Sequence, residues 1–568
     1  MNNIFFLIFR RMRTPLLALV ITYSIAVLGL VLIPGQDAEG NPWRMDFFHA
    51  FYFVSFMAST IGFGEIPYEF TDGQRLWVAF SIFFTVIVWI YSIGTLLALF
   101  QDHTFQNALI ERRFTRRIQQ LRDHFYLVCG YGETGSALVR SLTDRNQHAV
   151  AIDILEERVN LLKLENLRQY VPALCGDARL PIHLLEAGLK HPYCAGVVAL
   201  TDSNQTNLKI AITSKLLHPE ITVICRADSH DIEANMASFG TDYIIDPFDT
   251  FAIHLATALQ APCLNLLQEW LTKGDQEELH EPLYPPCKGL WVVCGYGRFG
   301  KAIYEQLVKE RLEVVVIEAE PEKTGMPRSG CILGVGTEAQ TLQEANIERA
   351  VGLVAGTDHD ANNLSIIMTA RQLNSKLFVI MRQNRKDNDP IIEAVNADMV
   401  MHPSAIIANR IRVLLGTPLL YQFTQLVLHQ EDSWACELVS RLSALVQDRA
   451  PEIWEVVFSE ETAHAVCQSF KDGKQIRCQH LLADPRERER SLKTIPLLLL
   501  RHDERIVLPK PSLVIEKHDR ILFAGSVSAK DSMEWTLQNE HALNYILTGE
   551  SRPQGWIWRW LRRKEVAR

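Results

Sequence analysis

The sequence of 568 residues lacks the patterns of several common functional classes. It has 11 cysteines but no Cys-x-x-Cys pair and no metal-ligand spacing, which predicts reduced thiols in an intracellular protein and no disulfide framework. It has no excess of basic residues, since the net charge is −9, and this argues against a nucleic-acid partner. Neither a nucleophile nor an acid–base pair stands out, so we expect no enzymatic activity.

Long uncharged segments are present, and they are confined to the first hundred residues. One covers 16–33 and the other covers 76–100, and each is long enough to cross a hydrocarbon core of about 30 Å. The alternative for the first segment is a signal peptide, since Arg10, Arg11 and Arg13 precede it, but no small-residue cleavage site follows. We therefore expect a multi-pass protein of the cell (inner or plasma) membrane.

Basic residues flank the two spans on one side only. Arginines precede the first span and the stretch ERRFTRRIQQLR follows the second, whereas the loop between the spans is mainly acidic. By the positive-inside rule, both termini face the cytoplasm and the loop faces outward. The protein is then in contact with membrane lipid through both spans.

A third apolar stretch, 43–59, lies between the spans and is too short to cross the membrane. It predicts a re-entrant half-helix that ends at the sequence ASTIGFGEIP. Irregular backbone at membrane depth is tolerated only where protein or a water-filled path surrounds it. The two glycines favour a backbone whose carbonyl groups are left without partners, and such groups are available to a cation.

This arrangement resembles the pore of potassium channels, whose filter has the sequence Thr-Val-Gly-Tyr-Gly. The resemblance implies that four chains place carbonyl groups on one axis, where they replace the water shell of a potassium ion. It also implies a gating hinge at Gly94 in the second span, where close helix packing is the alternative. No Arg-x-x-Arg series occurs in either span, so a ligand is expected to control gating. The implied filter residues are Thr60, Ile61, Gly62, Phe63 and Gly64, followed by Glu65.

The filter departs from the family pattern at two aromatic positions. Phe63 lacks the hydroxyl group of the usual tyrosine, so one bond that braces the filter from behind is missing. Phe56 stands where some members carry a second carboxylate. Potassium selectivity is still expected, but these departures leave its degree open.

The remainder of the chain contains an internal repeat at an offset of 165 residues. FYLVCGYGETGSALVRSL, from Phe125, matches LWVVCGYGRFGKAIYEQL, from Leu290. Each is an apolar strand, a G-x-G-x-x-G turn and a helix start, which is typical of a Rossmann-like unit that holds a pyrophosphate. The next strand of each copy ends in an acid, Asp153 or Glu318, at the spacing of a ribose-binding carboxylate. This favours NAD or an adenine nucleotide over NADP.

The repeat resembles the RCK (TrkA-N) domains that regulate potassium conductance. Tandem copies behind a two-span pore resemble the ligand-gated channels with a cytoplasmic gating ring, which implies a homotetramer. Asp177 matches a loop acid of the family near the nucleotide cleft, and the second copy has no Asp there. The implied nucleotide-binding residues are Gly130, Tyr131, Gly132, Glu133, Thr134, Gly135, Asp153, Asp177, Thr201 and Asp202 in the first copy, and Gly295, Tyr296, Gly297, Arg298, Phe299, Gly300, Glu318, Thr357 and Asp358 in the second.

The residues beyond about 420 predict a small third region with short strands. Its acids Glu431, Asp432 and Glu437 leave a calcium site open as an alternative to a solvated face. The chain then ends in a segment that interleaves tryptophan with arginine. A membrane surface, packing against the soluble part and disorder are all compatible with that composition.

The predicted fold class is a membrane α-helical pore, with two spans and a re-entrant helix, joined to two α/β Rossmann-like RCK domains and a small α+β lobe. We expect a potassium-selective channel gated by NAD, another adenine nucleotide or calcium. The alternatives are a membrane-tethered NAD-binding regulatory subunit and an NAD-dependent oxidoreductase. The expected boundaries are 1–101 for the pore module, 102–121 for a linker, 122–275 and 287–420 for the two RCK domains, 421–545 for the C-terminal RCK-C-like lobe and 546–568 for the basic aromatic tail.

Overall fold

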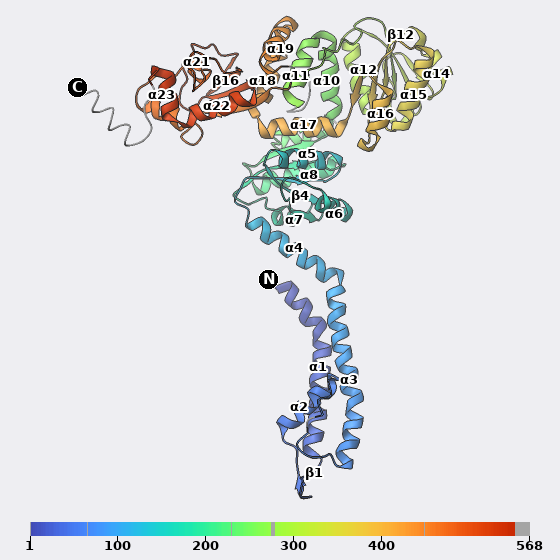
Figure 1. Cartoon of the computed structure of the whole chain (residues 1–568). Helices are drawn as coiled ribbons and strands as arrows, with labels where there is room; N and C mark the ends of the chain where they lie inside the picture. The colour runs from blue at the N-terminus through green and yellow to red at the C-terminus, as the bar shows by residue number, and fades with distance from the viewer. Residues whose placement is uncertain (1, 65, 229, 274–278, 448, 551–568) are drawn as a thin grey trace, which may run out of the picture. The chain divides into compact units, whose positions relative to one another are not determined.

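The computed structural model describes residues 2–64, 66–228, 230–273, 279–447 and 449–550 (Figure 1). The chain divides into two compact units, Met1–Leu121 and Arg122–Arg568. Each unit has its own apolar core, and each is described separately below.

The first unit is helical. Its elements are α1 (Asn2–Leu32), β1 (Gly35–Gln36), β2 (Pro42–Trp43), α2 (Phe47–Ala58), α3 (Asp72–Gln101) and α4 (His103–Gln119). The segments Phe9–Leu32 and Asp72–Gln101 are long and apolar enough to cross a membrane. The predicted half-helix is α2, which begins at the N-cap Asp46 and ends at the C-cap Ser59. The predicted linker forms α4.

Close contact between α1 and α3 holds the first unit together. The indole N–H of Trp77 donates to the carbonyl of Ala26 at 3.1 Å, across the interface between the two helices. Gly29 leaves the space for this ring, because a Cβ atom at that position would lie 2.0 Å from the indole. Polar residues follow the same side of α3, where Thr85 is fully buried and bonds the carbonyl of Ser81 at 2.9 Å.

The second unit begins with two parallel six-stranded sheets. The first has the order β5-β4-β3-β6-β7-β8 and the second has the order β11-β10-β9-β12-β13-β14. The strands of both sheets are continuous apolar runs, because helices cover both faces of each sheet. The first sheet contains β3 (Phe125–Cys129), β4 (His148–Asp153), β5 (Ala173–Cys175), β6 (Cys194–Ala199), β7 (Thr222–Arg226) and β8 (Tyr243–Ile245). The second contains β9 (Leu290–Cys294), β10 (Glu313–Glu318), β11 (Cys331–Leu333), β12 (Ala350–Ala355), β13 (Phe378–Arg382) and β14 (Met399–Met401).

The helices of the two copies occupy corresponding places. The first copy has α5 (Glu133–Asp144), α6 (Glu156–Leu164), α7 (Pro181–Glu186), α8 (Asn204–Leu217), α9 (His230–Ser238), α10 (Pro247–Gln260) and α11 (Pro262–Lys273). The second has α12 (Arg298–Lys309), α13 (Pro321–Thr324), α14 (Ala339–Glu344), η1 (Ile347–Arg349), α15 (Asp360–Leu373), η2 (Lys386–Asn388), α16 (Asp389–Val395) and α17 (Pro403–Gly416).

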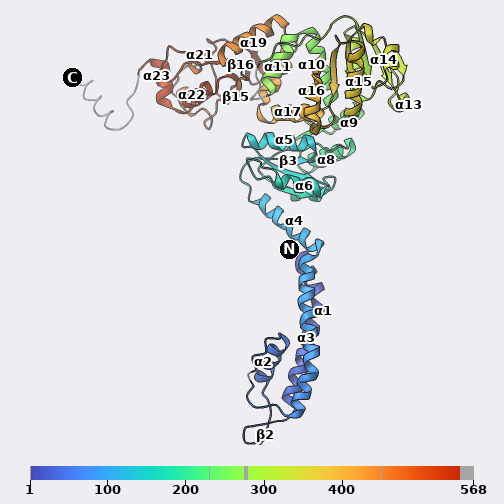
Figure 2. The same cartoon turned by 45° about the vertical axis from the view of Figure 1, so that its right-hand side comes forward.

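The two copies exchange the helices that follow their last strands, α10 and α17. Helix α17 of the second copy packs on α5 of the first, and α10 of the first copy packs on α12 of the second. Figures 1 and 2 show α17 beside α5 in both views. The exchanged helices enter the cores of the opposite copies, so neither core is complete without the other copy. The residues inserted are Ile407, Ala408, Ile411 and Leu414 in the first copy, and Phe248, Phe251, Ala252, Leu255 and Leu259 in the second.

The third region is an α+β lobe with an antiparallel sheet of order β15-β18-β16-β17. Its elements are α18 (Pro418–Val427), α19 (Asp432–Val446), β15 (Glu452–Val457), α20 (His464–Lys471), α21 (Cys478–Leu481), β16 (Thr494–Arg501), β17 (Glu504–Val507), β18 (Arg520–Gly525), α22 (Val527–Gln538) and α23 (Glu540–Thr548). The basic aromatic tail lies almost entirely outside the described residues.

The prediction that all cysteines are free thiols is wrong for one pair. Cys263 on α11 and Cys436 on α19 form a disulfide, with their Cα atoms 5.1 Å apart. The two residues are 173 positions apart in the sequence. They meet because α11 and α19 pack against each other, which joins the first copy to the third region. Spacing in the sequence carries no sign of this contact.

The substitution Gly29→Val tests the packing of α1 on α3. The added side chain cannot fit beside the Trp77 ring, so we expect a loss of about 1–3 kcal/mol in stability. Thermal unfolding of the full chain in detergent measures this loss. The matched control is Gly94→Val, because a Cβ atom at Gly94 has no atom within 4 Å. An equal melting temperature for both variants would contradict the packing described.

Candidate functional site

The backbone after α2 alternates between two conformations. The angle φ is positive at Thr60 (62°), Gly62 (66°) and Gly64 (72°), and it is not positive at Ile61 or Phe63. A positive φ is unfavourable for a β-branched residue such as threonine, so the segment holds a conformation that local preference opposes. Such strain is typical of a functional site.

Hydrogen bonds fix the start of this segment to the end of α2. The N–H of Thr60 donates to the carbonyl of Met57 at 3.1 Å, and those of Ile61 and Gly62 donate to the carbonyl of Phe56 at 3.1 and 3.3 Å. Among the described residues, no backbone hydrogen bond uses a carbonyl from 60–64 as its acceptor. The segment is therefore anchored through its N–H groups, and its carbonyl groups are left for another partner. The α2 C-terminus also directs its negative dipole end here.

The two aromatic departures from the filter pattern meet in space. The rings of Phe56 and Phe63 are 6.3 Å apart and nearly perpendicular. Phe56 also touches Tyr52 and Phe53, with ring distances of 5.4 and 5.0 Å. The ring of Phe63, which lacks the hydroxyl group of the usual tyrosine, therefore packs edge-to-face against an aromatic cluster on α2.

Two further pore residues were predicted from the sequence. Glu65 lies outside the described residues. Gly94 lies within α3, which is continuous from Asp72 to Gln101. Because a Cβ atom at Gly94 would meet nothing in the single chain, close packing within one chain does not explain this glycine.

The glycine turn of the first copy joins β3 to α5 at the centre of the sheet. Gly130 has a φ of 102°, and a Cβ atom at Gly135 would lie 2.0 Å from the carbonyl oxygen of Gly130. These glycines allow the helix start to approach the strand end. The sheet order places this turn between β4 and β6, where the direction of the strand order reverses, and such switch points bind ligands in open α/β sheets.

The second copy repeats this geometry. Gly295 has a φ of 94°, and a Cβ atom at Gly300 would lie 1.9 Å from the carbonyl oxygen of Gly295. The side chains of Thr134 in the first turn and Phe299 in the second are buried, so only their backbone groups can face a ligand. The exposed side chains at the first helical position have opposite charges, Glu133 in the first copy and Arg298 in the second.

Asp153 and Glu318, the two acids at the spacing of a ribose-binding carboxylate, accept backbone hydrogen bonds from the glycine turns. Asp153 accepts the N–H of Tyr131 at 2.6 Å and that of Leu155 at 2.8 Å. Glu318 accepts the N–H of Tyr296 at 2.5 Å and that of Glu320 at 2.8 Å. Both acids are almost fully buried. Each carboxylate thus holds the backbone of its turn by hydrogen bonds.

A threonine and an asparagine beside each glycine turn make the same hydrogen bonds in both copies. The hydroxyl of Thr201 donates to the side chain of Asn207 at 2.7 Å, and that amide donates to the carbonyl of Arg226 at 3.1 Å. In the second copy the hydroxyl of Thr357 donates to Asn363 at 2.6 Å. This repeated pair connects the ends of adjacent strands, because each asparagine bridges the strand before its helix to the strand after it.

Asp177 of the first copy forms an ion pair with Arg179. The guanidinium group of Arg179 donates to both carboxylate oxygens of Asp177, at 3.0 Å to Oδ1 and 2.7 Å to Oδ2. These bonds to Arg179 hold the pKa of the Asp177 carboxyl below its usual value. The residue follows β5, next to the strand that carries Asp153.

Four charged residues at the clefts were not singled out as ligands from the sequence. Arg158 lies 3.5 Å from Asp153 and 3.7 Å from Asp202. Arg226 lies 2.9 Å from Asp228, which is buried. Asp228 also pairs with Arg298 of the second copy. The fourth residue is Arg382, which the alignment of the two copies pairs with Arg226. Contacts between the copies leave no signal in one sequence.

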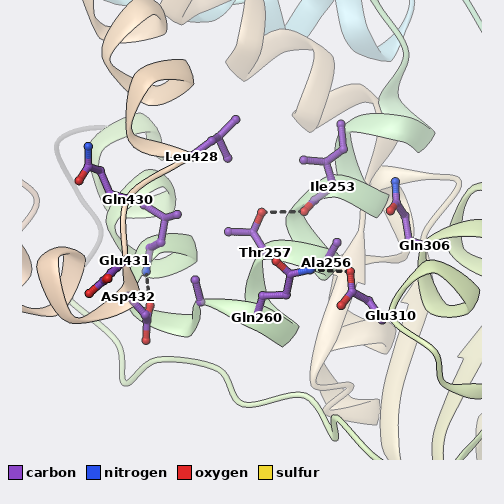
Figure 3. Close-up of a pocket in the computed structure, with 12 residues that line it drawn as sticks. Ile253, Ala256, Thr257, Gln260, Gln306, Glu310, Leu428, Gln430, Glu431 and Asp432 are labelled. Atoms are coloured by element: carbon purple, nitrogen blue, oxygen red, sulfur yellow. Dashed lines mark hydrogen bonds between the residues drawn. The ribbon is translucent and has the colours of Figure 1, made fainter.

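A cavity of about 510 Å³ lies away from both glycine turns (Figure 3). It is formed by α10, α11, the end of α12 and the connection between α18 and α19. Glu431 and Asp432, proposed as calcium ligands, line it, and Asp432 accepts the N–H of Leu264 at 3.1 Å. Among described residues, one group offers three metal-ligand atoms, and it combines Asp432 with the disulfide cysteines. Glu437 is not part of that group.

Comparison with protein-family models identifies the parts of the chain. Residues 16–102 match the ion channel family, and residues 126–247 and 291–403 each match the TrkA-N domain. These matches confirm the predicted combination of a channel module with tandem TrkA-N domains. The ion channel match and the two apolar helices make the chain a membrane protein.

Known potassium-transport proteins are similar to parts of this chain. Potassium channel protein 1 of Methanocaldococcus jannaschii is 27% identical over 237 residues, which are 41% of this chain and 68% of that protein. Probable potassium channel protein 2 of the same organism is 26% identical over 153 residues, 25% of this chain and 45% of that protein. A TrkA homologue of the Trk potassium uptake system from Pyrococcus abyssi is 31% identical over 136 residues, 22% of this chain and 60% of that protein.

Solved structures with a similar chain include the GsuK channel. It aligns with 94% of this chain and 99% of its own, at 17% identity and a TM-score of 0.47. The GsuK channel bound to NAD aligns at 16% identity with a TM-score of 0.46, over 94% of this chain and 100% of its own.

The substitution Phe56→Leu tests the aromatic support of the filter segment. Loss of the edge-to-face contact, worth about 0.5–1.5 kcal/mol, should lower the ratio of potassium to sodium permeability roughly two- to ten-fold. Ion flux into liposomes measures this ratio. Phe9→Leu, an exposed phenylalanine on α1, is the control. A ratio unchanged by Phe56→Leu would contradict the supporting role.

Asp246, the N-cap of α10, predicts a pH effect. It accepts the N–H of Phe248 at 2.7 Å, yet burial raises the pKa of its carboxyl to about 6. A raised pKa contributes stability that is present at pH below 4 and is lost as pH rises through 6. Asp246→Asn keeps the cap but removes this charge.

We therefore expect the melting temperature of Asp246→Asn to exceed that of the natural chain at pH 7.5, by an amount that corresponds to about 1–2 kcal/mol. The difference should shrink at pH 5. Thermal unfolding of the full chain at both pH values measures it, with the exposed Asp531→Asn as control. A natural chain that is more stable than the variant at pH 7.5 would contradict the argument.

Proposed function

We propose that four copies of this chain form a potassium-selective channel whose pore is lined by residues 60–64. The observation that carries this proposal is a segment anchored through its N–H groups, whose carbonyl groups accept no backbone hydrogen bond from the described residues. Such oxygens can replace the hydration shell of a monovalent cation. The Thr60 hydroxyl would add one more oxygen at the inner end.

The requirement for four chains follows from the geometry of coordination. One chain offers one carbonyl at each level, and a dehydrated potassium ion needs several at once. In the single chain, Ile61 and Phe63 are 62% and 69% exposed. Neighbouring chains of a homotetramer would cover these apolar side chains, which supports a closed ring rather than a separate subunit.

The proposed orientation places both termini in the cytoplasm. Arginines precede the apolar part of α1 and continue in α4, and Arg11 pairs with Asp102 at 2.7 Å. Basic residues at this end of both helices favour the cytoplasmic side of a cell membrane. The acidic loop between the spans would then face outward.

Gating is assigned to the two glycine turns. Each turn has a helix N-terminus next to a buried acid, which suits an adenine nucleotide such as NAD or ADP. A nucleotide that binds one arrangement of the soluble unit more tightly would shift the pore between closed and open states. The chain runs from α3 through α4 into β3, and Gly94 is the proposed hinge. This assignment includes no catalytic residue, and a calcium site at the acids near α19 is not part of it.

Flux from liposomes that contain the purified full chain tests this proposal. We expect potassium flux at least tenfold above sodium flux, and a change on adding NAD, NADH or ADP. Calcium alone forms a separate arm of the experiment. Asp153→Asn and Glu318→Gln weaken the turns one copy at a time and should shift the nucleotide response without changing selectivity.

The two parts of the proposal fail separately. Equal potassium and sodium permeation would contradict the filter assignment. Selective flux that ignores every nucleotide would contradict the gating assignment and leave the pore intact. Hydride transfer from NADH would instead support an oxidoreductase.

A further inference from the structure

A chain of alternating charges runs from the acid beside the first glycine turn to the second glycine turn. It begins at Asp153, the ribose-type acid of the first copy, and passes through Arg158 to Asp202, at 3.5 and 3.7 Å. Arg226 continues it, at 3.9 Å from Asp202 and 2.9 Å from Asp228. All of these residues belong to the first copy.

Arg298 extends this chain of charges into the second copy. Its guanidinium group pairs with Asp228, although the two residues are 70 positions apart. Arg298 is the first residue of α12, directly after Gly297 of the second turn. The residue that would face a phosphate in the second cleft is therefore held by a carboxylate of the first copy.

Asp228 and Arg298 differ in solvent exposure. Asp228 has only 6% of its side chain exposed, whereas Arg298 has 53% exposed. A buried carboxylate depends on its cationic partners, so Asp228 is stabilised by both Arg226 and Arg298. The exposed guanidinium group is free to be shared with a ligand.

An aromatic ring from the first copy also contacts the Arg298 side chain. Phe248 on the exchanged helix α10 contacts two arginines of the second copy, with Arg298 at 5.2 Å and Arg382 at 5.1 Å from its ring centre. Arg382 is held in turn by Asp358. The first copy thus supplies both a carboxylate and an aromatic wall to the second cleft.

The first cleft has the reverse arrangement of charge. Glu133 occupies the helix position that corresponds to Arg298, and it lies close enough to His402 of the second copy to act on its charge. His402 precedes the exchanged helix α17 and caps it. The first helical positions of the two turns therefore differ in charge, and only the second turn carries one that attracts phosphate.

We propose that Arg298 couples the two clefts, because a nucleotide phosphate at the second turn and Asp228 of the first copy compete for its guanidinium group. This inference rests on the proposed function of the turns as nucleotide sites. A phosphate that takes Arg298 leaves Asp228 with Arg226 alone. Arg226 then moves away from Asp202, and this loosens Arg158 beside the ribose-type acid of the first cleft. Occupancy of one cleft changes the affinity of the other, and linkage makes the effect reciprocal.

The test is a double-mutant cycle on the full chain in detergent, with ADP and NAD binding measured by calorimetry. Asp228→Asn removes the competitor and should tighten ADP binding at one class of sites roughly five-fold or more. Arg298→Gln should weaken the same class, and it should abolish the effect of Asp228→Asn. Lys376→Gln, an exposed cation before β13, is the matched control.

The reciprocal effect is measured by titrating NAD with and without saturating ADP. The natural chain should show a shift in NAD affinity that disappears in Arg298→Gln, where Asp228 keeps Arg226 as its partner and the melting temperature shows that the fold is retained. Additive effects of the two substitutions, or an unchanged NAD shift in Arg298→Gln, would overturn the coupling. A natural chain that binds neither nucleotide would instead overturn the proposed function.

Discussion

Unpaired peptide oxygens are the constraint on which the membrane unit depends. Backbone carbonyl groups at membrane depth cost several kcal/mol each when nothing satisfies them. In this chain the N–H groups at the start of the segment 60–64 are bonded back to α2, and no backbone hydrogen bond among the described residues uses the carbonyl groups of the segment. In the proposed channel, a cation that gives up its water supplies the partner that these carbonyl groups lack. Under that proposal, conduction and stability of the segment have the same physical origin.

A different constraint organises the soluble unit. Each Rossmann-like copy contributes its last helix to the core of the other, so the two copies cannot separate without exposing apolar side chains. The same exchange brings Phe248 and Asp228 of the first copy to the turn of the second. Packing that completes the cores thereby also places charged side chains between the two glycine turns, where the proposed coupling would let a bound phosphate act on both copies.

Local features were predictable from the sequence, and contacts across large separations were not. The glycine turns, Asp153 and Glu318 lie within one strand–turn–helix–strand unit, where spacing alone fixes their geometry. The spans and α2 follow from their apolar composition. The filter pattern indicated two weak points at Phe56 and Phe63, but only the structure shows that their rings contact each other.

Other features depend on how elements fold together. The pairing of Asp228 with Arg298 joins two copies of a repeat, and the Cys263–Cys436 disulfide joins helices 173 residues apart. Neither has a local pattern, so the expectation of reduced thiols was wrong for that pair. Charge and residue type identified the calcium candidates, and calcium binding there stays a prediction; the bond from the N–H of Leu264 on α11 to Asp432 was not predictable. Burial and hydrogen bonding, which composition does not encode, determine these contacts.

The most direct test of the central claim is anomalous scattering from crystals of the full chain grown in rubidium or thallium salts. The account predicts peaks on a four-fold axis, level with the carbonyl oxygens of Thr60, Ile61, Gly62 and Phe63. Crystals in which this segment lies away from a shared axis, or in which the heavy ions bind elsewhere and leave the axis empty, would contradict it.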